Sequence, residues 1–235
     1  MTTPTGRLRD PQQRAERATR ILDTAAELLL RHGYRRVSID DVAAGAGIGK
    51  GTVYLHWKTR EQLFAAVFAR DVLTAVGELT QVLRREPETG RLHRFARTYF
   101  LAVTSRPLLR GFLLTDPQLL GKLADAPGTD RDARHAEAGR DHMALLARHG
   151  LVRDDLSPEE IGFAYQATFE GFLRADDPTA TPERRADLLA DVVRRSLEPE
   201  QVPTDAVLRE AASALADLLD GLVAADREEF GIPAA

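Results

Sequence analysis

The sequence predicts an all-α fold, and three observations support this prediction. Apolar residues recur at helical spacing through most of the 235 residues, and long runs of β-branched residues are absent. The prolines stand at expected helix boundaries, and Ser, Thr or Asp precedes several of the expected helices, where such residues cap the first turn. We therefore expect a small three-helix domain over residues 1–60 and a larger helical domain over residues 61–235.

The first expected helix begins where Asp10, a capping residue, precedes Pro11. It ends at His32, because Gly33 follows and glycine commonly terminates helices. The polar residues 1–9 before it are expected to be disordered. Three arginines of this helix either follow a phosphate backbone or, more simply, form a solvated face: Arg14, Arg17 and Arg20.

A helix-turn-helix pattern comes next. Ser38 precedes an apolar stripe and Asp41 stands three residues later, which is the spacing of a capping box. The glycine-rich residues 45–51 suit a turn better than a helix, since each glycine costs about 1 kcal/mol there relative to alanine. Val53 and Trp57 are four residues apart and share one face of a second short helix. Two helices joined by such a turn are typical of DNA-binding proteins.

The outer face of this second helix carries the candidate DNA contacts. A recognition helix presents its N-terminal residues to base edges in the major groove. Lys50 has donors for bases or phosphates, Thr52 and Tyr54 suit either contact, and Gly51 lets the backbone approach closely. The complete candidate set is Ser38, Lys50, Gly51, Thr52, Tyr54, Leu55, His56, Lys58 and Arg60.

Residues 21–64 closely resemble the DNA-binding domain of TetR-type (TetR/AcrR family) transcriptional regulators. The most specific part begins at Gly49 and reads G-K-G-T-V-Y-x-H-aromatic-K-x-R-E-x-L-F. Two positions depart from the common form: Leu55 stands where Tyr is frequent, which removes one phosphate contact, and Trp57 replaces a frequent Phe. The resemblance implies a homodimer, an inverted-repeat operator in double-stranded DNA, and repression that a small-molecule effector relieves.

Charge and composition agree with this interpretation. Residues 1–60 hold 11 Lys and Arg against 6 Asp and Glu, a net charge of +5, whereas residues 61–235 hold 21 against 30, a net charge of −9. A basic footprint is therefore confined to one end of the chain. The absence of cysteine excludes disulfides, thiol chemistry and cysteine metal sites. No apolar run approaches 18 residues, so we expect a cytoplasmic protein without a membrane partner, metal or cofactor.

A long third helix begins after the capping residue Thr59 and continues to about Arg85. Further helices are expected over residues 91–105, after 116, and over 130–149, 158–175, 181–197 and 204–228. The helix over residues 158–175 is apolar nearly all round, which predicts burial between its own domain and a second subunit. The other interface helix is either 186–197 or 206–225, and the sequence does not separate them.

A mostly apolar cavity with a few polar groups is the usual form of a ligand site between helices. The candidate lining residues are Phe95, Tyr99, Phe112, His142, Met143, Phe163, Gln166, Phe169 and Glu170. Ordinary core packing is an equally good explanation of each residue taken singly.

Two other candidate sites are rejected. The glycine run that ends at Gly51 does not match the pattern of a phosphate-binding loop. Ala44 stands where that pattern needs a glycine, and Gly51 follows Lys50 where the pattern needs Ser or Thr. His135, His142 and His149 recur every seven residues, about 10 Å apart along a helix, which is too far for one metal. The alternative functions are a ligand-independent DNA-binding regulator and an all-α enzyme using the larger domain's pocket.

Overall fold

A computed structural model describes residues 11–125, 130–175 and 179–233, and the predicted all-α fold is confirmed: no strand occurs in these ranges. The disorder expected for residues 1–9 concerns a segment outside the described ranges. Within those ranges, no helix is long and apolar enough to cross a membrane.

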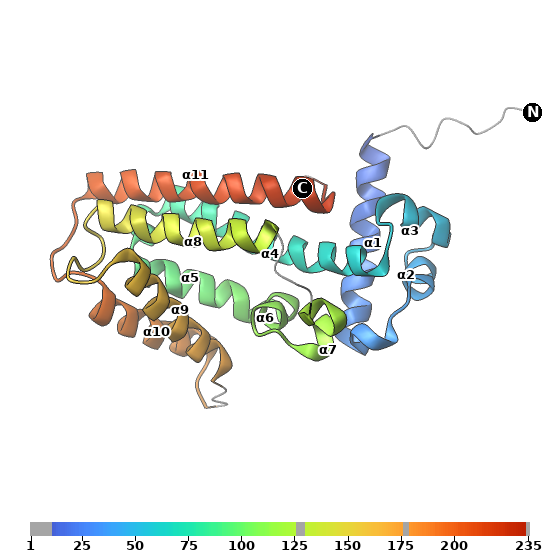
Figure 1. Ribbon diagram of the computed structural model, residues 1–235, viewed down its shortest axis with the longest axis horizontal. Helices are drawn as coiled ribbons and strands as arrows, with labels where there is room; N and C mark the ends of the chain where they lie inside the picture. The colour runs from blue at the N-terminus through green and yellow to red at the C-terminus, as the bar shows by residue number, and fades with distance from the viewer. Residues whose placement is uncertain (1–10, 126–129, 176–178, 234–235) are drawn as a thin grey trace, which may run out of the picture.

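The N-terminal elements gather at one end of the molecule, at the right in Figure 1. They are α1 (Pro11–His32), the 3-10 turn η1 (Tyr34–Arg36), α2 (Ile39–Gly45), α3 (Lys50–His56) and the start of α4 (Arg60–Arg85). The predicted helix-turn-helix elements are present, with both capping hydroxyls in use: Ser38 accepts from the amide of Asp41, and Thr59 accepts from the amide of Gln62. Leucine, isoleucine and aromatic side chains from α1 and α4 fill the core between them.

The rest of the chain forms a larger helical bundle (Figure 1). Its elements are η2 (Pro87–Gly90), α5 (Leu92–Thr104), α6 (Pro107–Leu113), α7 (Pro117–Leu120), η3 (Gly121–Asp125), α8 (Asp130–Arg148), α9 (Pro158–Arg174), α10 (Pro182–Leu197) and α11 (Asp205–Phe230). The long helices agree with the expected ranges to within about two residues. Ser157, Thr181 and Thr204 each accept a hydrogen bond from the first turn of the following helix, which explains this agreement. Helix α6 and the 3-10 turns were not expected.

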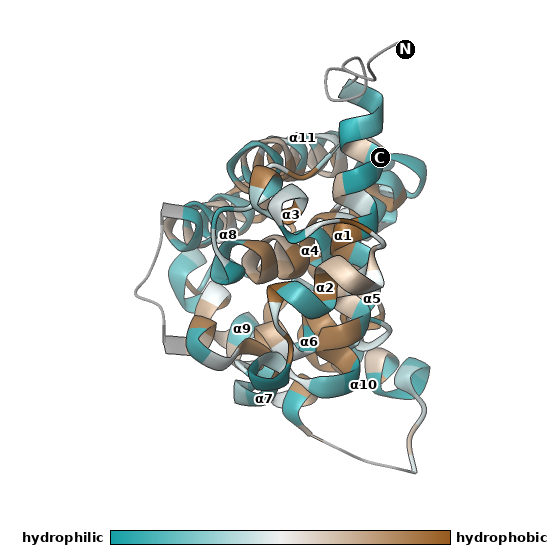
Figure 2. Cartoon of the chain, turned by 90° about the vertical axis from the view of Figure 1, so that its right-hand side faces the viewer, coloured by the Kyte–Doolittle hydropathy of each residue, from teal (hydrophilic) through white to brown (hydrophobic). Residues whose placement is uncertain are grey.

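Helix α4 belongs to both cores. Its first turns place Leu63, Phe64 and Phe68 in the N-terminal core, and its later turns pack into the larger bundle. Seen from the N-terminal end, the hydrophobic colour is concentrated where α4 passes through the centre (Figure 2). Leu108 of α6 and Leu120 of α7 also join the N-terminal core. The packing is therefore continuous across residue 60.

Helix α11 packs along α4 and covers it. Its C-terminal end returns to the N-terminal domain, where the indole Nε1 of Trp57 donates to the carbonyl oxygen of Phe230 at 3.3 Å. The first and last parts of the chain are thus joined directly (Figure 1).

Candidate functional sites

The turn between α2 and α3 has the conformation that its glycines predict. Gly47 has a φ of 66°, in the left-handed region that favours glycine, and Gly49 precedes the first residue of α3. Val53 and Trp57 are buried on the inner side of α3, as their spacing predicts. The turn and these two side chains determine which face of α3 points outward.

The outer face of α3 brings together most of the predicted DNA-contact residues. The exposed members are Lys50, Gly51, Tyr54, Leu55 and Lys58, and the partly buried members are Thr52 and His56. Leu55 is 57% exposed, which is unusual for a leucine in a folded domain. A β-carbon added at Gly51 would meet no atom within 4 Å, so this position presents bare backbone to the outside.

Lys50 has a partner within the domain that the sequence did not reveal. Its Nζ lies 2.8 Å from Oδ2 of Asp40 in α2, and both side chains are about half exposed or more. The hydrogen bond that the Lys50 ammonium donates to Asp40 raises the pKa of Lys50. The ammonium group is therefore charged and held over the α2–α3 turn, and Asp40 puts a carboxylate on the same surface. No residue pattern distinguishes Asp40 from an ordinary first-turn acid.

His56 lies close to the basic side of α1. Burial, followed by the charges of Arg14 and Arg17, lowers the pKa of His56 below 6.5. Its imidazole is therefore neutral at neutral pH and offers one donor and one acceptor nitrogen without a charge. The ring stacks on Trp57 with centroids 5.4 Å apart. Because the charges of Arg14 and Arg17 lower the pKa of His56, these two arginines of α1 lie on the same electropositive surface as the outer face of α3.

Two predicted DNA contacts already have partners inside the domain. The hydroxyl of Ser38 donates to Asp41 Oδ2 at 2.6 Å and accepts from the amide of Asp41, so it serves as a helix cap. The Nε of Arg60 donates to the carbonyl oxygen of Val37 at 2.9 Å, and its Nη2 donates to that of Tyr34. The Arg60 guanidinium also lies 4.1 Å from the centre of the Tyr34 ring. These contacts give Ser38 and Arg60 a structural role in the connection between α1 and α2. The sequence had suggested instead that both residues bind phosphates.

Replacing Arg60 with methionine is expected to lower the free energy of unfolding by about 1–3 kcal/mol, because two hydrogen bonds from a charged donor are lost. Urea denaturation measures the change. Lys58→Met is the matched control, since Lys58 is exposed and its side chain has no ion pair among the described contacts. Equal stabilities of the two variants would show that Arg60 is not a structural residue.

The larger bundle brings several of the predicted ligand residues together. Phe95 and Tyr99 of α5 lie 6.1 Å apart, Tyr99 stacks on Phe169 of α9 at 5.5 Å, and Phe95 lies 4.6 Å from the ring of His142 in α8. The sequence did not select Tyr165, whose ring is 5.9 Å from Phe169. We call these five residues the aromatic cluster. Met143 packs beside it, 3.3 Å from where a β-carbon on Gly162 would lie.

Four predicted ligand residues lie elsewhere. Phe163 is 77% exposed, and Gln166 donates to Glu170 at 3.1 Å on the outer side of α9. Phe112 stacks on Phe68 of α4 at 6.0 Å, at the junction of the two cores. The positions of these four residues do not support the prediction that they line one cavity with the aromatic cluster.

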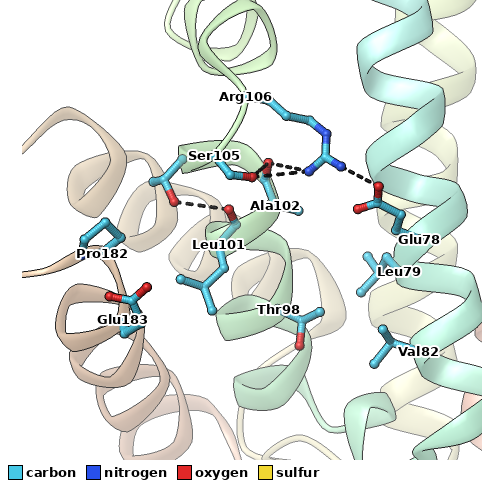
Figure 3. A pocket seen from close by; sticks show the side chains of 11 residues that line it. Glu78, Leu79, Val82, Thr98, Leu101, Ala102, Ser105, Arg106, Pro182 and Glu183 are labelled. Carbon is cyan, nitrogen blue, oxygen red and sulfur yellow. Dashed lines mark hydrogen bonds and ion pairs between the residues drawn. The ribbon is translucent and has the colours of Figure 1, made fainter.

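A surface groove of about 510 Å³ lies between α4, α5 and α10, and none of the nine predicted ligand residues lines it. Figure 3 shows Leu79 and Val82 of α4 facing Leu101 of α5, with an ion pair between Glu78 and Arg106 at one edge. Among the residues that the structure describes, no group of three or more His, Asp or Glu is arranged to hold a metal ion.

Comparison with known sequences identifies a shared N-terminal domain. The sequence model of the family described as "Bacterial regulatory proteins, tetR family" matches residues 21–67. The chain is 27% identical over 150 residues to the transcriptional activator FasR of Mycolicibacterium smegmatis, a match that covers 59% of this chain and 68% of FasR. Three further mycobacterial regulators match over 56% of their own length.

Two comparisons extend over most of the chain. The transcriptional repressor AcnR of Corynebacterium efficiens is 25% identical over 177 residues, which cover 75% of this chain and 90% of AcnR. Among solved structures, the transcriptional regulator SCO4942 of Streptomyces coelicolor superimposes with a TM-score of 0.52 and 25% identity, and covers 77% of this chain and 98% of its own. The similarity thus includes the larger bundle as well as the matched N-terminal domain.

Proposed function

We infer that the chain is a TetR-type transcriptional regulator and not an enzyme. On this premise, it is a homodimer that binds an inverted repeat in double-stranded DNA and represses transcription until a small effector releases it. The observation that carries the proposal is the outer face of α3. Basic, hydroxyl and exposed apolar side chains occur there together, and the opposite face of α3 is buried. Such a face fits the major groove, which offers acceptors, donors and thymine methyl groups.

Each predicted side chain has a distinct task in this arrangement. Lys50, Thr52 and Tyr54 read base edges, and the exposed Leu55 contacts a thymine methyl. Lys58 and the α1 arginines near His56 bind phosphates and fix the position of the helix. The net charge of +5 over residues 1–60 supports this division, because the acidic remainder repels DNA.

The dimer is proposed to form through α9 and α10. Phe163 of α9 is 77% exposed, and Leu188 and Val192 of α10 are each 40% exposed. Both helices lie at the lower left of the bundle in Figure 1. Helix α11, the alternative second interface helix, buries its apolar face on α4, and on its outer side Asp217 and Asp220 pair with Arg84. A two-fold axis through α9 and α10 would present two α3 helices to major grooves about 34–36 Å apart.

Repression is preferred over activation because of the extent of similarity. FasR is named an activator and matches 59% of this chain, whereas AcnR is named a repressor and matches 75% of it. In vitro transcription from a promoter that contains the bound sequence decides between the two. Reduced transcript in the presence of the protein is the expected result.

Replacing Lys50 with alanine is expected to weaken binding to the specific sequence by about 10–100-fold per half-site, the range for loss of a base contact. The bound sequence is first selected from random duplexes with the wild-type protein, and the selected sites should contain an inverted repeat. Gel-shift titration then compares wild type and variant. Arg209→Ala is the matched control, because it removes one exposed positive charge near the N-terminal end of α11. That end of α11 lies at the opposite side of the molecule from α3 in Figure 1.

Circular dichroism checks that the Lys50 variant keeps its fold, which is expected because its ion pair with Asp40 is exposed. Undiminished affinity of a folded Lys50→Ala variant would refute the assignment of α3 as the reading helix. An equal loss of DNA affinity in Arg209→Ala would show that the effect of Lys50→Ala comes from net charge alone.

A further inference from the structure

The aromatic cluster contains two buried polar atoms without a hydrogen-bond partner. They are Nε2 of His142 and the hydroxyl oxygen of Tyr165. His142 is only 6% exposed. Buried polar groups are nearly always satisfied, because an unmatched one is destabilising. The two atoms therefore distinguish this cluster from ordinary apolar core, which has no polar atoms to satisfy.

Both groups are uncharged at neutral pH. Burial lowers the pKa of His142 to about 4, so its imidazole is neutral and has one donor and one acceptor nitrogen. Burial raises the pKa of Tyr165, which keeps its hydroxyl protonated. Burial likewise raises the pKa of Tyr99 to about 12. The cluster thus offers hydrogen bonds to a bound molecule but no charge.

Among the residues that the structure describes, Arg131 is the one charged group that acts on the titratable rings of the cluster. The positive group that acts on Tyr99 is Arg131, and its Nε already lies 3.0 Å from Oδ2 of the buried Asp226. An ion placed among the five rings would lose its hydration without gaining a partner, which is strongly unfavourable. A neutral molecule with apolar faces has no such cost.

We propose that the aromatic cluster between α5, α8 and α9 binds an uncharged, largely apolar ligand that carries hydrogen-bonding groups for His142 Nε2 and the Tyr165 hydroxyl. This inference rests on the proposed function, in which a small effector binds the larger bundle. Met143 is a flexible side chain at the α8–α9 contact and yields space for the ligand. Phe95 packs with Leu79 and Leu83 of α4, so a ligand that displaces Phe95 acts on the helix that carries the N-terminal domain.

The first test uses the ligand-free protein. Tyr165→Phe removes an unsatisfied hydroxyl and keeps the ring, so the Tm is expected to rise by about 2–4 °C. Tyr34→Phe is the matched control, because the Tyr34 hydroxyl donates to Glu61 at 3.3 Å and its loss is expected to lower the Tm. A lower Tm in Tyr165→Phe would show that its hydroxyl already has a partner, and would overturn the inference.

The second test uses three probes of one shape in calorimetric titrations of the full chain. 2,6-Dihydroxynaphthalene is expected to bind, naphthalene to bind more weakly, and the charged 6-hydroxy-2-naphthoate not to bind. Tyr165→Phe is expected to weaken the diol about tenfold and to leave naphthalene unchanged. Failure of the diol to bind, or tighter binding of the carboxylate, would overturn the inference.

These outcomes are separable from failure of the proposed function. Wild-type DNA binding, measured without any probe, tests the regulator assignment by itself. If the diol binds in the expected way but DNA affinity does not change with the diol present, the site stands and effector control is refuted.

Discussion

A chain that carries both Phe163→Asp and Val192→Asp is expected to be a monomer at micromolar concentration. The two side chains are 77% and 40% exposed in the single subunit, so the substitutions create no buried charge there. At a two-fold interface, each new carboxylate would face the apolar surface of the other subunit and would lose its hydration. Each substitution occurs once in each subunit, so the dimer bears this cost twice at each position. Analytical ultracentrifugation gives the mass directly.

The same variant is expected to bind the full inverted repeat about 10²–10⁴-fold more weakly. In a dimer, binding of one α3 helix brings the second to its half-site at a high effective concentration, and a monomer loses this gain. Binding to an isolated half-site should be unchanged, because the α3 surface lies at the opposite end of the molecule from α9 and α10 (Figure 1).

Val202→Asp is the matched control for this variant. Val202 is 84% exposed between α10 and α11, and no other large apolar side chain of the described chain is as exposed. It should remain a dimer and bind the full repeat normally. A dimeric double variant would instead place the interface away from α9 and α10.

The helix boundaries were predictable because the capping signals are local. Ser38 with Asp41 and Ser157 with Glu160 form complete capping boxes, and each side-chain bond spans only three residues. Pro158 and Pro182 occupy the first positions of their helices for the same local reason. Such contacts can be recognised in a sequence because both partners lie within one turn.

The roles of individual side chains were less predictable, because their partners are distant in the chain. Arg60 reaches back to the carbonyls of Tyr34 and Val37, and Trp57 donates to Phe230, 173 residues later. A basic residue at the start of a helix has the same local pattern whether it binds phosphate or backbone. Hydrophobic periodicity describes one helix at a time and carries no information about these partners.

The ligand candidates of α9 illustrate the same limit. Ile161, Tyr165 and Phe169 follow one another every four residues and face the core, whereas Phe163 stands about 200° around the helix from Ile161. The helix is apolar on both sides, so the sequence offered no means of telling the inner stripe from the outer one. Gln166 and Glu170, which the sequence suggested as polar groups of the cavity, lie on the outer side of the helix.

The second large effect concerns the end of α11. Asp226 is fully buried, and its carboxylate contacts Arg131, Arg134 and His135 of α8 at 2.7–3.0 Å. Four residues later, Phe230 accepts the hydrogen bond from Trp57 of the N-terminal domain. The ion cluster therefore anchors to α8 the segment of α11 that meets the N-terminal domain.

Asp226→Asn is expected to lower the free energy of unfolding by about 3–5 kcal/mol, because Arg131, only 7% exposed, would keep its charge without a full counter-charge. Asp217→Asn is the matched control on the same helix. Its carboxylate is 71% exposed and pairs with Arg84, so its loss should cost about 0–1 kcal/mol. Similar costs in urea denaturation would show that the buried cluster contributes no more than a surface ion pair.

The acid stability of the wild-type protein should reflect the same carboxylate. Burial by itself would raise the pKa of Asp226, but hydrogen bonds from His135 and Arg134 and the charge of Arg131 outweigh it and hold the pKa at about 2, below the ordinary 3.8. Because the folded pKa is the lower one, this contribution is fully present above about pH 4 and is lost as the pH falls toward 2. One pH unit corresponds to ~1.4 kcal/mol, so the loss attributable to Asp226 is about 2 kcal/mol. Between pH 4 and 2, urea denaturation should therefore show the stability difference between wild type and Asp226→Asn narrowing by that amount, and a constant difference would exclude Asp226 as the titrating group.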